Sequence, residues 1–410
     1  MNSVDIFTMA LGLQSPWHVS KVEFLVGDDK NNELHLWLSY EAGFKFSTLD
    51  GKFSTAYDTI DKTWRHLNFF QHRCYLHASV PRVKSGEHQI HMVKVPWARE
   101  NSGFTLLFEA YTMLLIEKEM PVSSVSCTIK ETAPRIWRVF NHWIQKAFQS
   151  DDLSSIRKIG VDETSRKKGH KYITQFVDLD TRRTLFVTEG KDAKTFELFA
   201  QELQCKGGKV ENIELVSMDM SVAFISGCLS TFTNAQIIFD KFHIVQYLNK
   251  ALDEVRRIEH YNCNLLKGER YTLLHKSSKL SKEQIQKLDQ ILISYPTIGE
   301  AYGFRESFMD VFCIENPDDA KGYLTYWCDV VMDSGIQPFK KFVGIIKAHW
   351  YGITTYFDNK GISNGILEGI NSKIQLAKRR ARGYTNVDNF INMIYFIAGR
   401  LKVDYPHDSL

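Results

Sequence analysis

Several features are missing from this 410-residue chain, and each absence excludes a class of protein. Its seven cysteines stand singly, and no C-x-x-C pair occurs, so the sequence offers neither a thiol redox motif nor a cysteine-rich zinc knuckle. No stretch approaches the ~18 uninterrupted apolar residues of a membrane span, and the N-terminus lacks the basic and apolar segments of a signal peptide. We therefore expect a cytoplasmic protein with reduced cysteines and no membrane partner.

A large net charge is also missing, since 51 basic residues face 48 acidic ones. This balance alone does not indicate a nucleic-acid partner, and the 44% hydrophobic content is that of an ordinary globular protein. Local clusters of charge carry more information than the total. Most such clusters are solvated surface, but two stand out as candidate DNA contacts: Arg166, Lys167 and Lys168, and Lys378, Arg379, Arg380 and Arg382.

The first 150 residues contain two different patterns. Residues 1–100 include alternating polar and apolar segments, such as 33–40 and 72–80, which predict a small β module. Residues 101–150 have helical periodicity and predict a short helix, a tight link and a longer helix. This arrangement is typical of a helix-turn-helix DNA-binding unit, although a three-helix packing unit without DNA contact is the alternative. The candidate DNA contacts on the longer helix are Arg135, Arg138 and Asn141.

The rest of the chain predicts a multidomain α/β protein. Residues 151–245 have the order βββαβαβα, which is typical of an RNase H-like fold, a mixed sheet with helices on both faces. Residues 246–355 are helical throughout and predict an all-α insertion. Residues 356–410 return to the core with a helix that begins near Ser363 or Asn364.

Three acidic residues occupy positions that this fold would bring together. Asp162 lies in the first strand of the core, Asp219 ends the fourth, and Glu368 lies on the C-terminal helix. The first and fourth strands are neighbours in an RNase H-like sheet, so both aspartates would emerge at the same end of the sheet. Clustered carboxylates need a cation, and their hard oxygens suit Mg²⁺ or Mn²⁺. Asp219 alone is equally a turn or cap residue, and Glu368 alone is an ordinary surface residue. Asp162 is harder to explain in this way, because it follows Gly160 and Val161 in an apolar strand, and the prediction rests on the joint pattern.

Several segments are similar to landmarks of one protein family: 64–72, 95–99, 160–165, 218–220 and 364–371 with 378–383. On these segments the chain resembles the insertion-sequence transposases of the ISL3 group, which carry a DDE catalytic domain. The resemblance implies that Asp162, Asp219 and Glu368 are the catalytic and metal-binding triad. It also implies a secondary D-x-x-H element formed by Asp240 and His243.

The chain departs from the family at its N-terminal module, which usually contains a four-ligand zinc finger. By alignment, the ligand positions fall at Ser47, Asp50, Ser85 and His88, and no cysteine remains among them. Structural zinc normally needs four ligands that include cysteine, so we expect no zinc. The β module would then be held by its own packing, with these aromatic contributors: Trp64, Phe69, Phe70 and Tyr75.

These expectations combine into a DDE transposase that binds double-stranded DNA at the terminal inverted repeats and at the target. It would cut and join strands with two Mg²⁺ or Mn²⁺ ions, roughly 3.5–4 Å apart. The helix-turn-helix would read bases, and the basic clusters would contact phosphates. Synapsis of two ends predicts a nucleoid-associated homodimer or larger assembly. Two alternatives remain: a transposon-derived repressor or domesticated factor that no longer cuts, and a host RNase H-like nuclease or resolvase.

Overall fold

The computed structural model describes residues 2–28, 30–85, 89–167, 171–260, 266, 268–275, 280–359 and 365–405. The chain forms two compact units, one from Met1–Phe148 with Lys402–Leu410 and the other from Gln149–Leu401. Each unit contains both strands and helices, so the predicted multidomain α/β class is confirmed. Among the described residues, no helix is long and apolar enough to cross a membrane.

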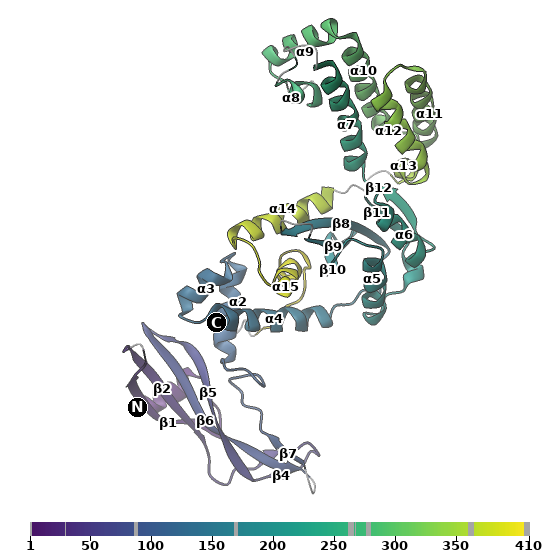
Figure 1. Ribbon diagram of the computed structural model, residues 1–410. Helices are drawn as coiled ribbons and strands as arrows, with labels where there is room; N and C mark the ends of the chain where they lie inside the picture. The colour runs from purple at the N-terminus through teal and green to yellow at the C-terminus, as the bar shows by residue number, and fades with distance from the viewer. Residues whose placement is uncertain are drawn as a thin grey trace. The chain divides into compact units, whose positions relative to one another are not determined.

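A five-stranded sheet forms the N-terminal part of the first unit (Figure 1). Its strands are Trp17–Val26 (β1), Asn32–Tyr40 (β2), Asp58–Phe69 (β5), His72–Ser85 (β6) and Gln89–Met92 (β7). The order is β1-β2-β6-β5 with β7 also paired to β6, and only β2 and β6 run parallel. A separate two-stranded pair consists of Phe46–Ser47 (β3) and Phe53–Ser54 (β4).

Two expectations for this module are wrong. Residues Ser3–Ala10 form a helix (α1) in place of β structure, because Asn2 and Asp5 make a capping box that starts it. Phe70 does not pack in the core, since it lies in the turn between β5 and β6 with φ of 51° and its side chain is 81% exposed. Trp64 is buried as expected, and Phe69 and Tyr75 are half-buried.

Three helices follow the sheet within the first unit: Leu106–Glu117 (α2), Val122–Ile129 (α3) and Ala133–Gln149 (α4). α3 ends at Lys130, whose left-handed φ of 55° gives a short turn into α4. α4 buries Ile136, Phe140 and Trp143 on one face and exposes Arg138 on the other. The predicted short helix, tight link and longer helix are therefore present.

A buried carboxylate joins these helices to the segment that precedes them. Glu109 on α2 is fully buried, and it accepts hydrogen bonds from Arg99 Nε at 2.9 Å and Ser102 Oγ at 2.6 Å. It also accepts the indole N–H of Trp143 at 2.9 Å. Because a buried charge is tolerated only when it is paired, this set of contacts fixes α2 against α4.

The second unit contains a mixed five-stranded sheet (Figure 1). Its strands are Lys158–Lys167 (β8), Lys171–Asp178 (β9), Arg183–Glu189 (β10), Leu215–Met218 (β11) and Gln236–Phe239 (β12). The order is β10-β9-β8-β11-β12; β8, β9 and β10 are antiparallel, and β11 runs parallel to both β8 and β12. The first and fourth strands are therefore neighbours, as predicted.

Helices cover both faces of this sheet. One face packs against Lys194–Cys205 (α5) and Val222–Thr231 (α6), and there Phe176 of β9 stacks on Phe199 of α5 at 4.4 Å. Gly365–Arg380 (α14) lies on the other face, and Val387–Ala398 (α15) lies beside β10. Gly160 lets α14 approach closely, because a Cβ atom there would lie 2.9 Å from Leu367.

The described residues between β12 and α14 are mostly helical, as predicted. Its helices are Lys241–His260 (α7), Arg270–Leu274 (α8), Lys282–Ser294 (α9), Pro296–Asp310 (α10), Pro317–Asp333 (α11), Gln337–Ala348 (α12) and Trp350–Asp358 (α13). Aromatic residues form its core, where Phe308 lies 4.9 Å from the Trp327 ring and 5.2 Å from Phe342. Short 3₁₀ turns occur at Val210–Asn212 and Val311–Cys313.

Candidate functional site

Asp162 lies in β8, opposite Gln175 of β9, and its side chain is partly buried on the face covered by α14. One carboxylate oxygen accepts the backbone N–H of Glu163 at 2.8 Å, and the other accepts the side-chain amide of Asn371 at 2.6 Å. No lysine or arginine of the described ranges forms an ion pair with Asp162. Neutral donors therefore hold this carboxylate in place.

Asn371 connects α14 to two strands of the sheet. Besides its bond to the aspartate, its Oδ1 accepts from Gln175 Nε2 at 2.6 Å and from Thr164 Oγ1 at 3.1 Å. Gln175 and Thr164 are both buried. One more contact lies further along the helix, where Lys378 Nζ donates to the Ser165 carbonyl at 2.8 Å. Side chains thus fix the position of α14 along β8.

Glu368 lies one turn before Asn371 on α14, and it is exposed. It lines a cavity of about 280 Å³ together with Asp240 and Tyr356, at the ends of β11 and β12. The expected caps of its helix, Ser363 and Asn364, lie outside the described residues. Glu368 is therefore located at the same end of the sheet as the aspartates that follow the parallel strands.

Asp219 and Asp240 have equivalent places after the two parallel strands. Asp219 follows β11 and accepts the backbone N–H of Ser221 at 2.9 Å. Asp240 follows β12 and accepts the backbone N–H of Phe242 at 2.9 Å. Each aspartate thus stabilises the turn into the next helix, which is a common structural role for this residue type. That role uses one oxygen of each carboxylate.

The acidic residues of β8 resist ionisation. Burial raises the pKa of Asp162 to about 6, and the charge of Asp219 adds to this, while hydrogen bonds from Glu163 and Asn371 and the charge of His243 oppose it. Burial also raises the pKa of Glu163, which Lys191 lowers and Asp219 raises. The charges of Asp219 and His243 act on both acids, so these predicted residues lie near the same part of the sheet.

The three residues of the predicted triad do not form one metal-binding cluster. Within the described ranges, no three acidic, histidine or cysteine side chains are close enough together to hold a metal ion. Carboxylate oxygens are nevertheless the donors that Mg²⁺ and Mn²⁺ prefer, and Asp162 is a carboxylate without a cationic partner among the described residues. The chemistry of the donors fits such a metal, and the assignment of Asp162, Asp219 and Glu368 to it stays a prediction.

The basic residues predicted to contact DNA in this unit have different surroundings. Arg166 is mostly enclosed, 3.7 Å from Glu189, and Lys378 is held against β8. Lys167 is the last residue of β8, and Lys168 lies outside the described residues. Among the described side chains of the two clusters, the exposed ones are Arg379 and Arg380 at the end of α14 and Arg382 just after it.

The three candidates on α4 also differ. Arg138 is exposed, and Asn141 is half-buried. Arg135 is engaged within the unit, because its Nη1 donates to Glu131 at 2.6 Å and its guanidinium lies 4.3 Å from the centre of the Phe104 ring. Arg135 therefore anchors the start of α4, and Arg138 is the better placed of the two arginines for an external ligand.

Two positions aligned with the family's zinc ligands are joined by a hydrogen bond. Ser85 Oγ, at the end of β6, donates to Asp50 Oδ1 at 3.0 Å, and Thr48 Oγ1 donates to the same oxygen. Ser47 is exposed, and His88 lies outside the described residues. The segment between β3 and β4 is thus connected to β6 by hydrogen bonds.

Two residues of the site were not predicted from the sequence, Asn371 and Gln175. The spacing of Asn371, three residues after Glu368, places both on one side of a helix and is a usable signal. Gln175 gives a second signal, because a glutamine close to Ile173 and Phe176 in a predicted strand needs a buried partner.

Comparison with known protein families identifies the chain. Residues 159–394 match a transposase family, and residues 93–144 match the helix-turn-helix domain of transposase family ISL3. The first match runs from β8 to α15, and the second includes α2, α3 and most of α4. The chain therefore belongs to the ISL3 family of insertion-sequence transposases and contains a helix-turn-helix DNA-binding domain. Transposases of this family cleave and transfer DNA in the broad sense, and they generally use divalent metal ions.

Individual relatives support this assignment. The transposase for insertion sequence element IS1557 of Mycobacterium tuberculosis is 28% identical over 356 residues, which cover 79% of this chain and 78% of that protein. The transposase for insertion sequence element IS1001 of Bordetella parapertussis is 25% identical over 394 residues, covering 93% and 95%. A solved simian T-cell lymphotropic virus intasome in complex with PP2A regulatory subunit B56 gamma is 12% identical and covers 42% of this chain and 70% of that chain. Its TM-score of 0.17 carries no argument about the fold.

Proposed function

We propose that this transposase binds the terminal inverted repeats of its element and cuts and joins DNA strands at Asp162, Asp219 and Glu368. One observation carries the proposal: the 2.6 Å hydrogen bond from Asn371 to Asp162 ties the helix that bears Glu368 to the first strand of the sheet. This contact between residues far apart in the sequence supports the convergence that such a site requires.

The strand arrangement supports an RNase H-like core. Three antiparallel strands are followed by two parallel ones, and the first and fourth strands pair. Helices α5 and α6 on one face and α14 on the other agree with that architecture.

The triad would hold two Mg²⁺ or Mn²⁺ ions, which when bound activate the attacking oxygen and stabilise the leaving oxygen of an in-line displacement. The residues of the chain have their own tasks. Asn371 and the N–H of Glu163 orient the Asp162 carboxylate. Glu368 would supply the third carboxylate from α14.

DNA binding would be shared between the units. Arg138 and Asn141 on α4 would read base edges of the inverted repeat, and the exposed arginines at the end of α14 would contact phosphates. Holding two ends together calls for a homodimer or larger assembly.

A cleavage assay on supercoiled DNA that carries the element's ends tests the proposal. Strand cleavage should require Mg²⁺ or Mn²⁺, and Glu368→Gln should abolish it while end binding stays near the wild-type level. Glu283→Gln, an exposed acid on α9, is the matched control and should cut normally. Normal cutting by Glu368→Gln would remove Glu368 from the site.

One observation favours a second candidate, a transposon-derived DNA-binding protein that does not cut. The positions aligned with the family's zinc ligands, Ser47, Asp50, Ser85 and His88, contain no cysteine. The same assay separates the two functions, because a non-cutting protein binds the ends and yields no nicked or linear product with either metal.

A further inference from the structure

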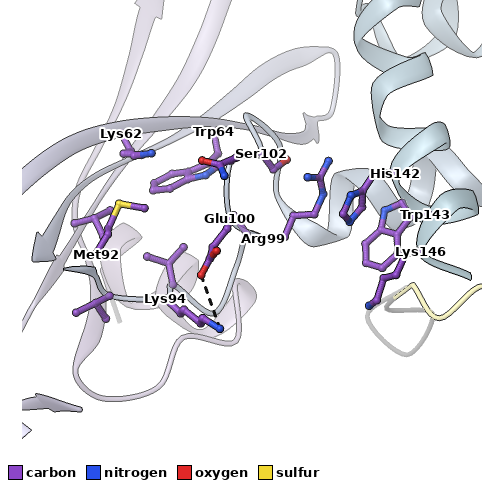
Figure 2. A pocket seen from close by; sticks show the side chains of 15 residues that line it. Lys62, Trp64, Met92, Lys94, Arg99, Glu100, Ser102, His142, Trp143 and Lys146 are labelled. Carbon is purple, nitrogen blue, oxygen red and sulfur yellow. Dashed lines mark ion pairs between the residues drawn. The ribbon is translucent and has the colours of Figure 1, made fainter. Parts of the chain in front are cut away.

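A cleft opens in the first unit between the sheet and α4 (Figure 2). Its volume is about 580 Å³. Lys62 of β5 and Lys94, which follows β7, stand on the side of the sheet, and His142 and Lys146 stand on α4. Basic side chains therefore line both walls of the cleft.

Arg99 and Lys94 of the cleft already have acidic partners, and the two ion pairs differ in burial. Arg99 forms an ion pair with the buried Glu109 at 2.9 Å. Lys94 lies 3.8 Å from Glu100, and both side chains are exposed. An exposed pair of this kind contributes little and exchanges readily for another anion.

The other two lysines have no such partner. No acidic residue of the described part of the chain forms an ion pair with Lys62 or Lys146. The Lys146 ammonium lies 5.1 Å from the centre of the Trp143 ring, a contact that favours one position of this long side chain. Two positive charges without an ionic partner among the described residues thus line the cleft, one on each wall, and an anionic ligand that reaches both walls would neutralise them.

The cleft continues from the exposed face of α4. Arg138, His142 and Lys146 follow one another at intervals of four residues, so they form a strip along the helix. A DNA duplex that lies on Arg138 would extend its sugar-phosphate backbone toward Lys146. The charge and the position of the cleft therefore fit the backbone that flanks the bases read by α4.

We propose that Lys62 and Lys146 bind phosphates of the duplex that α4 reads, so that the sheet and the helix hold one DNA backbone between them. This inference rests on the proposed binding of the element's ends. It assigns the N-terminal sheet a direct part in DNA binding, one that does not depend on sequence, because phosphates carry no base identity.

The salt dependence of DNA binding tests the assignment. The full-length chain with Lys62→Gln and Lys146→Gln is compared with the wild type by fluorescence anisotropy, on a duplex with the element's end and on an unrelated duplex. The slope of log affinity against log salt should decrease by about 2, near 0.9 for each lost phosphate contact, and by the same amount on both duplexes. A control with Lys30→Gln and Lys45→Gln removes two exposed charges of the same unit and should keep the wild-type slope.

Other outcomes have distinct meanings. An unchanged slope in the cleft variant, with an unchanged melting temperature, would overturn the assignment. An unchanged slope together with a changed mass in light scattering would overturn it in favour of contact with a second copy. A wild type that binds both duplexes equally would contradict end recognition, and the slope on unrelated DNA would still decide whether the two lysines bind phosphate.

Discussion

Two carboxylates, the fully buried Glu109 of the first unit and the partly buried Asp162 of the second, have opposite surroundings. Glu109 of the first unit is paired with an arginine, a hydroxyl and an indole N–H. Asp162 of the second accepts hydrogen bonds from two amides, and no lysine or arginine pairs with it among the described residues. A charge neutralised within the protein serves the fold, whereas one without a counter-ion is suited to bind one from outside. The type of partner thus distinguishes the two carboxylates better than burial does.

Replacement of Glu109 is expected to have the largest effect on stability. Glu109→Ala leaves Arg99 and Trp143 without their buried acceptor, so the first unit should lose about 3–5 kcal/mol of unfolding free energy. Tryptophan fluorescence in urea measures this, since six of the eight tryptophans lie in that unit: residues 17, 37, 64, 97, 137 and 143. Glu41→Ala, at an exposed position, is the control. Equal midpoints for both variants would refute a structural role for Glu109.

The free energy of unfolding of the first unit is expected to decrease at acidic pH. Burial, with the neighbouring Arg65 charge, lowers the pKa of His66 to about 4, so the folded unit binds its proton less well than the unfolded chain. Stability should therefore fall as the pH drops from 6.5 toward 4, by about 2 kcal/mol at pH 4.5. His66→Gln should remove this part of the pH dependence in the same fluorescence experiment. A variant as acid-sensitive as the wild type would contradict the assignment.

The free energy of unfolding of the second unit is expected to decrease as the pH rises. The pKa of Asp162 is raised to about 6, so its contribution to stability is present at low pH and is lost as the pH rises through 6. Asp162→Asn, which loses one hydrogen bond and the charge, should stabilise the metal-free unit by about 1–2 kcal/mol at pH 7.5 and by nothing at pH 4. Hydrogen exchange of peptides from β8 and β9 measures this. A variant less stable than the wild type at pH 7.5 would show that Asp162 serves the fold, as Glu109 does.

The smallest effect is expected at Asn371, which acts through Asp162 and Glu368. Asn371→Leu should lower the affinity for Mg²⁺ by about tenfold or more, because the carboxylate loses its orienting donor. The measurement is the Mg²⁺ concentration that half-saturates cleavage, together with the Mg²⁺-induced shift in melting temperature. Asn389→Leu on α15 gives a control for a lost asparagine. An unchanged half-saturation would make Asn371 merely structural.

Local patterns in the sequence determine much of what is observed. Alternation in 33–40 and 72–80 corresponds to β2 and β6, and the short strands after residue 155 form the mixed sheet. These elements could be predicted because each buries one face, or both, with a regular period. Helix α1 could not, because none of its residues is fully buried and its start depends on a capping box.

Contacts between distant residues explain the remaining differences. Arg135 has the residue type of a DNA contact, yet Glu131 and Phe104 occupy its side chain. The hydrogen bonds of Asn371 join residues more than 190 positions apart, and no local pattern encodes such a contact. The sequence therefore indicates which residues have suitable chemistry, and only the fold shows which of them are already engaged.

Three points of attachment locate α14 on β8, at Gly160, Asp162 and Ser165. The helix that bears Glu368 is therefore attached to the first strand by contacts of its own, in addition to the cavity that Glu368 lines with Tyr356 of the preceding helical excursion. Loop closure costs little more when a loop is lengthened, so this excursion is free to grow, shrink or accept a foreign domain. Accessory parts can therefore be added in the middle of the second unit while α14 keeps its place on β8.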